Sequence, residues 1–257
     1  MQSELRENRF KQALAGGVRQ VGFWLTLASP NATEVVAGAG FDWLLIDMEH
    51  AANEVPTVVE HLRAAITGGA AEPVVRVPWN EPVVVKRLLD CGARSLMFPY
   101  IQNADDARRA VASTRYPPKG IRGFSGVSRA TNFGRVRDYV GRCEEEICVI
   151  AQIESPGALA AVPEIAAVPG IDGVFIGPND LAANLGFVGR AGAPEVRAEI
   201  DKGLALIRAS GKPAGLLNFS ESDALAQFQA GFTFIAVGSD TGVLARNAEK
   251  LARFFQG

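Results

Sequence analysis

Residues 147–180 read ICVIAQIESPGALAAVPEIAAVPGIDGVFIGPND, and two short apolar runs in this stretch indicate the architecture. The runs, 147–153 and 172–177, are almost continuously apolar and are bounded by polar residues, Gly or Pro. Such runs are typical of parallel β-strands that are covered on both faces. The segment between them has a helical pattern and begins at Ser155, a residue type favoured at helix N-caps. The stretch therefore predicts a strand–helix–strand unit.

The same alternation continues along the whole chain. Strands are also predicted at 21–27, 42–48, 72–77, 95–99, 212–217 and 232–238. Helical patterns occur at 31–40, 55–69, 81–92, 103–115, 155–168, 194–211, 220–231 and 240–255. Eight strand–helix pairs predict an α/β protein, a (β/α)8 TIM barrel that forms a single domain over residues 1–257. A doubly wound sheet is the alternative, but no G-x-G-x-x-G follows the first strand.

The composition excludes several classes of protein. Hydrophobic residues make up 48% of the 257 residues and charged residues 21%, which is too apolar for a disordered chain. Lys and Arg total 26 against 28 Asp and Glu, so no basic excess is present for binding nucleic acid. No apolar run approaches the ~20 residues that span a bilayer, and residues 1–17 are charged and helical in pattern, unlike a signal peptide. We therefore expect a cytoplasmic protein without a nucleic-acid or membrane partner.

In a TIM barrel the chemistry lies at the carboxyl ends of the strands and in the loops that follow them. Five polar residues occupy such positions here: His50, Arg76, Gln152, Glu154 and Asp180. Because the chain has two histidines, a metal site built from imidazoles is nearly excluded, whereas two carboxylates with water suit Mg²⁺ or Mn²⁺. Glu154 and Asp180 are therefore candidate metal ligands. The alternative is that Asp180 caps a helix and Glu154 forms an ion pair.

His50 and Arg76 are candidates for the chemistry itself. A histidine transfers protons near neutral pH, although a hydrogen-bonded histidine at the rim is the alternative for His50. Arg76 lies in an apolar strand, where an unpaired guanidinium would be costly, so it must face an anion. That anion is either an internal carboxylate, Glu49 or Glu154, or an oxyanion of the substrate. His61, in an amphipathic segment, is interpreted as a residue of a helix face without a role.

Two apolar residues are predicted to contact substrate. Trp24 lies in the first predicted strand and either walls the mouth of the barrel, meaning the end where the strands finish, or packs in the core. Leu217 is the last residue of the seventh predicted strand. No lysine occupies a strand's carboxyl end, and Lys212 begins the seventh strand at the opposite face. We therefore do not expect a Schiff-base mechanism, which needs a desolvated lysine in the mouth.

Several segments in the same order resemble one family. They are FDWLLIDMEH (41–50), VVRVPWNEPVVVKRLLDCGA (74–93), RYPPKGIRG (115–123), AQIES (151–155), GIDGVFIGPNDLA (170–182) and FIAVGSD (234–240). Through these segments the sequence resembles the HpcH/HpaI aldolases, which are metal-dependent pyruvate aldolases. The similarity extends over nearly the whole chain.

The resemblance implies a class II aldolase. Such an enzyme reversibly cleaves a 2-keto-4-hydroxy acid, like 2-dehydro-3-deoxyglucarate or 4-hydroxy-2-oxoheptanedioate, into pyruvate and an aldehyde through an enolate that the metal stabilises. Glu154 and Asp180 would hold the divalent cation, Mg²⁺, Mn²⁺ or Co²⁺. Gln152 would position ligand or water, and backbone amides around Asn179 and Asp180 would hold the pyruvate carboxylate.

The resemblance also implies roles in proton transfer and charge stabilisation. Arg76 would stabilise the enolate oxygen. His50 would act in acid–base chemistry and would be oriented by Asp90, a residue that only the resemblance singles out. Two loops differ from the family pattern, Ala51–Ala52 and residues 124–134, and both are predicted to touch the aldehyde.

The predicted partners are the small substrates, pyruvate or another 2-keto acid and an aldehyde, and further copies of the chain. The resemblance implies a homo-hexamer, a trimer of dimers. The final helix ends in adjacent phenylalanines, Phe254 and Phe255, which predict that it packs on a neighbouring subunit. Two other functions stay open. One is a CoA-thioester lyase of the citrate lyase β-subunit or malyl-CoA lyase type, and the other is a barrel that binds keto acids without turnover.

Overall fold

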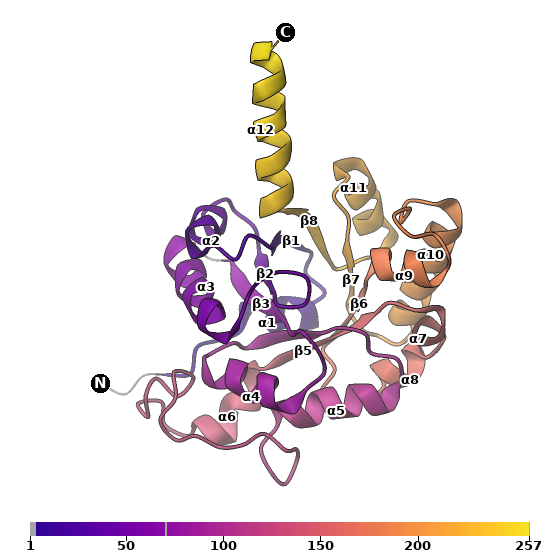
Figure 1. Ribbon diagram of the computed structural model, residues 1–257. Helices are drawn as coiled ribbons and strands as arrows, with labels where there is room; N and C mark the ends of the chain where they lie inside the picture. The colour runs from indigo at the N-terminus through magenta and orange to yellow at the C-terminus, as the bar shows by residue number, and fades with distance from the viewer. Residues whose placement is uncertain (1–3, 70, 257) are drawn as a thin grey trace.

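The computed structural model describes residues 4–69 and 71–256 and has the predicted architecture, a closed (β/α)8 barrel (Figure 1). Neighbouring strands pair in parallel in sequence order, and the last strand pairs with the first. The strands are β1 (Gln20–Leu25), β2 (Trp43–Asp47), β3 (Glu72–Arg76), β4 (Ser95–Phe98), β5 (Cys148–Ile153), β6 (Gly173–Ile176), β7 (Ala214–Leu217) and β8 (Phe234–Ser239). All eight predicted strands are confirmed. The pattern predicts them because a parallel strand covered on both faces has an almost continuously apolar sequence.

The helices surround the barrel and connect its strands. In the described residues they are α1 (Arg9–Ala15), α2 (Pro30–Ala37), α3 (Val55–Gly68), α4 (Pro82–Asp90), α5 (Ala104–Thr114), α6 (Tyr139–Glu146), α7 (Pro156–Ala160), α8 (Val162–Ala166), α9 (Pro178–Asn184), α10 (Pro194–Ala209), α11 (Glu221–Ala230) and α12 (Asp240–Gln256). The predicted helix 155–168 forms two helices that meet at Ala161, where Pro163 cannot donate a backbone hydrogen bond. The helix expected within residues 1–17 is α1; residues 1–3 lie outside the described residues.

Aromatic side chains fill the barrel interior. The ring of Phe234 lies 6.0 Å from that of Trp43 and 5.9 Å from that of Phe175. At the N-terminal end, α1 closes the barrel with Phe10, whose ring centroid is 5.5 Å from Trp43 and 5.6 Å from Phe234. Gly22 makes room for this packing, since a Cβ there would lie 2.1 Å from the Trp43 ring. The interior is therefore a packed core, and chemistry is confined to the carboxyl end.

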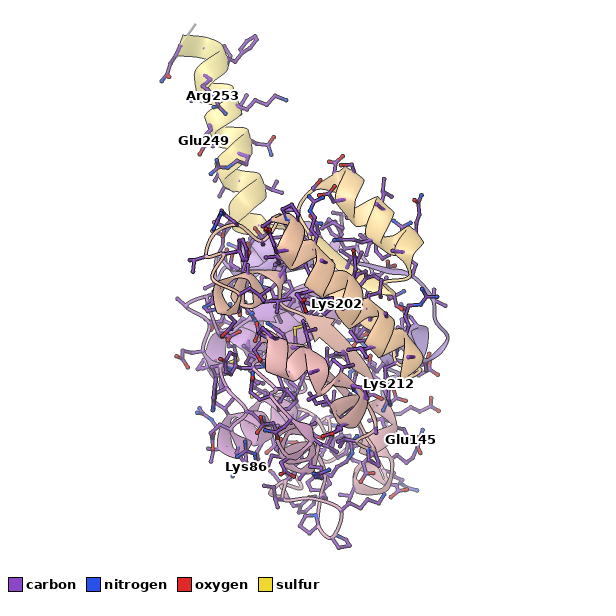
Figure 2. The ribbon with its side chains drawn as sticks, turned by 90° about the vertical axis from the view of Figure 1, so that its right-hand side faces the viewer. Lys86, Glu145, Lys202, Lys212, Glu249 and Arg253 are labelled. Atoms are coloured by element: carbon purple, nitrogen blue, oxygen red, sulfur yellow. The ribbon has the colours of Figure 1, made fainter. Side chains whose placement is uncertain are left out.

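The last helix, α12, extends away from the barrel instead of packing along its wall (Figures 1 and 2). Figure 2 shows Glu249 and Arg253 on this isolated part of the helix. Its exposed apolar residues are Val243, Leu244, Leu251, Phe254 and Phe255. No helix in residues 4–69 and 71–256 is both long and apolar enough to cross a membrane.

Candidate active site

Arg76 and Asp47 end two neighbouring strands, and their side chains form a buried ion pair. Arg76 Nε donates to Asp47 Oδ1 at 2.9 Å, and Arg76 Nη2 donates to Asp47 Oδ2 at 2.6 Å. Trp24 joins them, because its Nε1–H donates to Asp47 Oδ2 (3.1 Å) and its ring centroid lies 5.0 Å from Arg76 Cζ. Burial raises the pKa of Asp47, but the hydrogen bonds and charge of Arg76 outweigh that effect and lower it. Asp47 is therefore ionised and fixes the plane of the guanidinium.

The loop after β2 carries Glu49 and His50. The carboxylate of Asp47 accepts hydrogen bonds from the backbone N–H groups of Glu49 (3.0 Å) and His50 (3.3 Å). Glu49 Oε2 lies 2.8 Å from Arg76 Nη1, an ion pair without hydrogen-bond geometry. The internal partners of Arg76 are thus Glu49, as predicted, and Asp47, in place of Glu154. The side chain of His50 is exposed at the mouth, where a substrate could reach it.

Glu154 follows β5, is buried, and lies among other carboxylates. The Tyr100 backbone N–H donates to Glu154 Oε2 at 2.8 Å, and Gln152 Nε2 donates to Glu154 Oε1. Burial and the charges of Glu49 and Asp180 nevertheless raise the pKa of Glu154 to about 7. The other amide atom, Gln152 Oε1, is buried without a hydrogen-bond partner in the structure. Glu154 forms no ion pair in the described residues, and its charge interacts with that of Arg76 only over a longer distance.

Asp180 lies in the first turn of α9, just after β6. The alternative that Asp180 caps this helix is wrong, because its N-cap is Gly177 and no side chain makes a capping hydrogen bond. Gly177 also brings the two carboxylates together. A Cβ at Gly177 would lie 2.5 Å from Glu154 Oε1, so the Glu154 carboxylate lies against the turn that carries Asp180.

Carboxylates exceed cations at this end of the barrel. The four carboxylates are Asp47, Glu49, Glu154 and Asp180. In the described part of the chain, every ion pair they form involves Arg76. The two remaining carboxylates and the unpartnered Gln152 oxygen are hard oxygen donors of the kind that Mg²⁺ or Mn²⁺ prefers. The described residues hold no cluster of three or more His, Cys, Asp or Glu side chains fit for a metal, so other ligands would come from water or substrate.

The predicted substrate contacts occupy two places. A cavity of about 190 Å³ beside the ends of β6 and β7 is lined by Asn179 and Leu217, among others. Leu217 also packs against the apolar side chains of the barrel interior. Trp24 is buried in that interior and reaches the mouth through its hydrogen bond to Asp47. Trp24 therefore packs in the core and also borders the mouth, so each of its two interpretations describes part of its position.

The structure does not bring Asp90 to His50 within one chain. Asp90 ends α4, from which the chain returns to the N-terminal side of the barrel, whereas His50 follows the carboxyl end of β2. The Asp90 carboxylate accepts a hydrogen bond from Arg122 Nη2 (3.1 Å), and its carbonyl accepts one from the Ala130 N–H (3.1 Å). Residues 124–134, predicted to touch the aldehyde, therefore lie beside Asp90 and away from the mouth of their own barrel.

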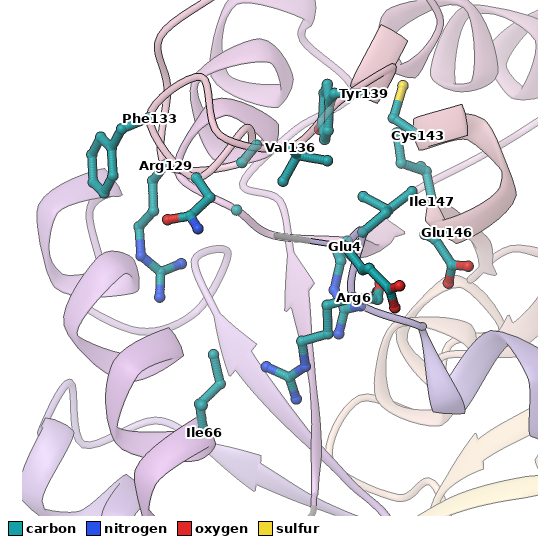
Figure 3. Close-up of a pocket in the computed structure, with 15 residues that line it drawn as sticks. Glu4, Arg6, Ile66, Arg129, Phe133, Val136, Tyr139, Cys143, Glu146 and Ile147 are labelled. Carbon is teal, nitrogen blue, oxygen red and sulfur yellow. Dashed lines mark hydrogen bonds between the residues drawn. The ribbon is translucent and has the colours of Figure 1, made fainter. Parts of the chain in front are cut away.

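A second cavity, of about 330 Å³, lies beside the N-terminal segment and the chain before and within α6 (Figure 3). Arg6, Arg94 and Arg129 line it together with Glu4 and Glu146. Its lining includes four residues of the loop 124–134, Arg129, Ala130, Asn132 and Phe133, but none of the candidate metal ligands nor His50 or Arg76. The candidate site is therefore the mouth, where His50, Arg76, Gln152, Glu154 and Asp180 lie at the carboxyl ends of the strands.

Sequence reasoning missed three features of this mouth. Asp47 is not among the predicted residues, although its place at the end of an apolar strand is the same signal that identifies the other candidates. Tyr100 contributes a backbone N–H, for which a sequence carries no signal. Gly177 acts through the space that it leaves beside Glu154, which becomes visible only in three dimensions.

Comparisons with known proteins identify the family of this chain. The family model described as HpcH/HpaI aldolase/citrate lyase matches residues 20–247. A protein named 4-hydroxy-2-oxo-heptane-1,7-dioate aldolase, from Salmonella dublin, is 50% identical over 97% of this chain and 95% of its own length.

Solved structures show the same relationship. An HpcH/HpaI aldolase/citrate lyase family protein from Burkholderia cenocepacia J2315 has a TM-score of 0.93 and 42% identity, over 97% of this chain and all of that one. The citrate synthase SbnG has a TM-score of 0.85 and 28% identity, over 96% and 97% of the two chains. The chain therefore belongs to the HpcH/HpaI aldolase/citrate lyase family, and it is an aldolase, a lyase that acts on carbon–carbon bonds.

Proposed function

We propose that this aldolase reversibly cleaves a 2-keto-4-hydroxy acid of the 4-hydroxy-2-oxoheptanedioate type into pyruvate and an aldehyde. The observation that carries the proposal is the excess of carboxylates at the mouth, with Glu154 held at a pKa of about 7 beside the Arg76–Asp47 pair. The 50% identity to an enzyme of that name supports the substrate class. Breaking the bond between C3 and C4 leaves an electron pair on C3, and only delocalisation onto the C2 oxygen makes this charge tolerable.

Glu154 and Asp180 would hold the divalent cation, Mg²⁺, Mn²⁺ or Co²⁺. When bound there, such a cation supplies Lewis-acid chemistry at the carboxylate and C2 oxygens of the keto acid. Gln152 Oε1, buried without a partner, would accept a hydrogen bond from water or ligand beside it. The backbone N–H groups at Asn179 and Asp180, in the first turn of α9, face an anion favourably because they lie at a helix N-terminus.

Arg76 would add a second positive group at the C2 oxygen. Its guanidinium is held by Asp47 through two hydrogen bonds, so it needs no reorganisation when charge develops. During cleavage His50 would take the proton from the C4 hydroxyl, and C3 of the enolate would then gain a proton from solvent to give pyruvate. During synthesis C3 of pyruvate would lose a proton, and His50 would return one to the new alkoxide. His50 is exposed after β2, so a substrate at the mouth could reach it.

The test is a pyruvate-release assay with 4-hydroxy-2-oxoheptanedioate and 2-dehydro-3-deoxyglucarate. We expect EDTA to abolish cleavage and Mg²⁺, Mn²⁺ or Co²⁺ to restore it. Borohydride with pyruvate should leave the protein unmodified, and a covalent adduct would overturn the mechanism. Cleavage of malyl-CoA in place of the keto acids would favour the thioester lyase instead.

The site would be completed by a neighbouring copy in a cytoplasmic homo-hexamer. Asp90 and residues 124–134 lie together but away from their own mouth, so they could reach a His50 only in another subunit. The exposed apolar residues of α12 would pack on a neighbour as well. Residues from separate regions of one chain would thus contact the next.

Mixed oligomers test this assembly. His50→Ala and Asp90→Ala should each be nearly inactive alone. When the two are co-expressed, pairing of an intact His50 with an intact Asp90 from another chain should restore about a quarter of wild-type activity. No recovery in oligomers shown to contain both variants would remove Asp90 from the neighbouring site. Sedimentation of the wild-type chain gives the number of subunits.

A further inference from the structure

The loop that carries Glu49 and His50 is tied back to the strand before it by side-chain hydrogen bonds. At its start, the Asp47 carboxylate accepts from the N–H groups of Glu49 and His50. At its end, Asn53 Nδ2 donates to the backbone carbonyl of Asp47 at 2.8 Å. Asn53 is only 2% exposed, so this bond is made away from water. The two ends of residues 48–53 therefore converge on Asp47.

Asn53 is held in turn by His61. His61 lies on α3 with 0% of its surface exposed, and its Nε2 is 2.9 Å from Asn53 Oδ1. Its other ring nitrogen, Nδ1, is 2.6 Å from Oγ1 of Thr33 on α2. A continuous buried chain of hydrogen bonds thus runs from α2 through α3 to the end of β2. The interpretation of His61 as a helix-face residue without a role does not account for these contacts.

The donors in this chain follow from its geometry. Because the Asn53 amide nitrogen donates to Asp47, its oxygen must accept, so His61 Nε2 carries a hydrogen. Burial lowers the pKa of His61, which favours the neutral ring. Nδ1 then accepts from the Thr33 hydroxyl, and both ring nitrogens are satisfied. This chain of hydrogen bonds specifies one tautomer of His61 and one orientation of the Asn53 amide.

We infer that His61 and Asn53 are positioning residues, which fix Asp47 and the loop 48–53 and thereby orient Arg76 and His50 for the reaction. This inference rests on the proposed function of the mouth. Asp47 is the link, since the same residue receives Asn53 on its carbonyl and Arg76 on its carboxylate. Neither positioning residue touches substrate. Loss of either one should therefore lower kcat and leave the KM for substrate nearly unchanged.

Two substitutions at His61 separate positioning from packing. In His61→Gln the side-chain amide nitrogen can take the place of Nε2 and donate to Asn53, whereas in His61→Asn it is too short and can replace only Nδ1. We expect His61→Gln to keep kcat within about threefold of wild type and His61→Asn to lower it about tenfold or more, as for other orienting partners. Equal kcat values for the two variants would overturn the inference.

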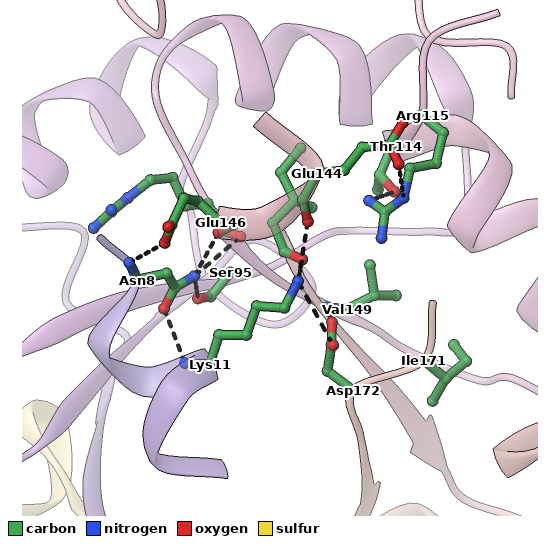
Figure 4. A network of polar contacts seen from close by, with 12 residues as sticks. Asn8, Lys11, Ser95, Thr114, Arg115, Glu144, Glu146, Val149, Ile171 and Asp172 are labelled. Atoms are coloured by element: carbon green, nitrogen blue, oxygen red, sulfur yellow. Dashed lines mark hydrogen bonds and ion pairs between the residues drawn. The ribbon is translucent and has the colours of Figure 1, made fainter. Parts of the chain in front are cut away.

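A matched control lies at the other end of the barrel. Asn8 is also a fully buried amide, and its Nδ2 donates to Ser95 Oγ and to the Glu146 carbonyl, both at 2.8 Å (Figure 4). Asn8→Ala and Asn53→Ala should both lower the melting temperature. We expect kcat to fall in Asn53→Ala alone. An equal fall in both variants would show that Asn53 acts only on stability.

A substrate-free readout keeps this test separate from the proposed function. The Trp24 indole N–H donates to Asp47 Oδ2, so its NMR resonance reports the position of that carboxylate. We expect the resonance to shift in His61→Asn and Asn53→Ala but not in His61→Gln or Asn8→Ala. A resonance that stays in place in all four variants would overturn the inference even if the enzyme is active. An inactive wild-type chain with the predicted shifts would contradict only the proposed function.

Discussion

At the N-terminal end of the barrel, the buried carboxylate of Glu72 is paired with the guanidinium of Arg94 and lies 3.8 Å from that of Arg6. Asp172 at the same end lies 3.8 Å from Lys11 Nζ and accepts from the Val149 N–H, part of the network in Figure 4. At the carboxyl end, by contrast, Arg76 pairs with Asp47 and Glu49, and Glu154 and Asp180 form no ion pair in the described residues. Burial raises the pKa of Glu72 and of Asp172 as it does that of Glu154, but the two N-terminal carboxylates have cationic partners within the chain.

This difference separates stability from function. At the N-terminal end the charged groups are already paired and α1 closes the barrel, so a bound ligand would add little stability there. At the mouth, Glu154 has a pKa of about 7 because burial and neighbouring carboxylates oppose its charge. Uncompensated charge in a buried site costs stability in the absence of a ligand, and binding of that ligand removes the cost. Substitutions at the N-terminal end should therefore lower stability and spare kcat, whereas substitutions at the mouth should lower kcat.

The largest effect is expected for Glu154→Gln, which keeps the shape of the side chain and removes its charge. Loss of a metal ligand should reduce kcat by more than about 100-fold, beyond the effect of outer residues. Steady-state pyruvate release with Mn²⁺ measures it. Glu146→Gln, at the N-terminal end, is the control and should retain wild-type kcat. Near-normal turnover by Glu154→Gln would remove this residue from the metal site.

Arg76→Lys should be next in size. Lysine keeps the charge but loses the forked donors that bind Asp47, so a preorganised donor to the C2 oxygen is lost and kcat should fall about 100-fold.

Arg94→Lys makes the same change in the ion pair with Glu72 at the other end. It should lower the free energy of unfolding and leave kcat unchanged. Urea unfolding and initial rates distinguish the two variants, and equal losses of kcat would contradict the division between the ends.

Gly177→Ala should have a smaller effect. The new Cβ would lie 2.5 Å from Glu154 Oε1, so the carboxylate must move, and Mn²⁺ affinity should fall about tenfold. Gly157→Ala is a suitable control because a Cβ there meets no atom within 4 Å. Isothermal titration with Mn²⁺ measures both variants. Unchanged affinity in Gly177→Ala would mean that the position of Glu154 is not critical.

A change in stability, with none in turnover, is expected with pH in the metal-free chain. The pKa of Glu154 rises from 4.5 to about 7 on folding, so the folded state binds this proton more tightly than the unfolded state. This difference adds up to roughly 3 kcal/mol to the free energy of unfolding below about pH 4.5. The contribution is lost as the pH rises through about 7. Urea unfolding in EDTA at several pH values, for wild type and Glu154→Gln, measures it. In Glu154→Gln the free energy of unfolding should lack this dependence on pH. The same pH dependence in both proteins would contradict the assignment.

The sequence predicts the strands well because each is a short, buried parallel strand with a continuous apolar run. It also places Arg76, Gln152, Glu154 and Asp180 at the mouth, since the position of a residue relative to a strand's end is local information. The contacts between Asn53, His61 and Thr33 could not be predicted in this way. They join α2, α3 and the loop after β2 through side chains that local patterns do not relate.

The position of Asp90 shows a second limit. Its identity follows from resemblance alone, and the single chain places it beside Arg122 and away from His50. Contacts between copies of a chain leave no periodic signal in the sequence, so neither the resemblance nor the barrel pattern indicates which subunit would supply this residue.

We propose that the mouth holds a divalent cation between Glu154 and Asp180. Electron paramagnetic resonance of free Mn²⁺, titrated with the wild-type chain in the presence of pyruvate, measures that binding directly. We predict one tight site per chain, lost in Glu154→Gln and in Asp180→Asn and retained in Glu146→Gln. Equal Mn²⁺ binding by all four proteins would contradict the claim.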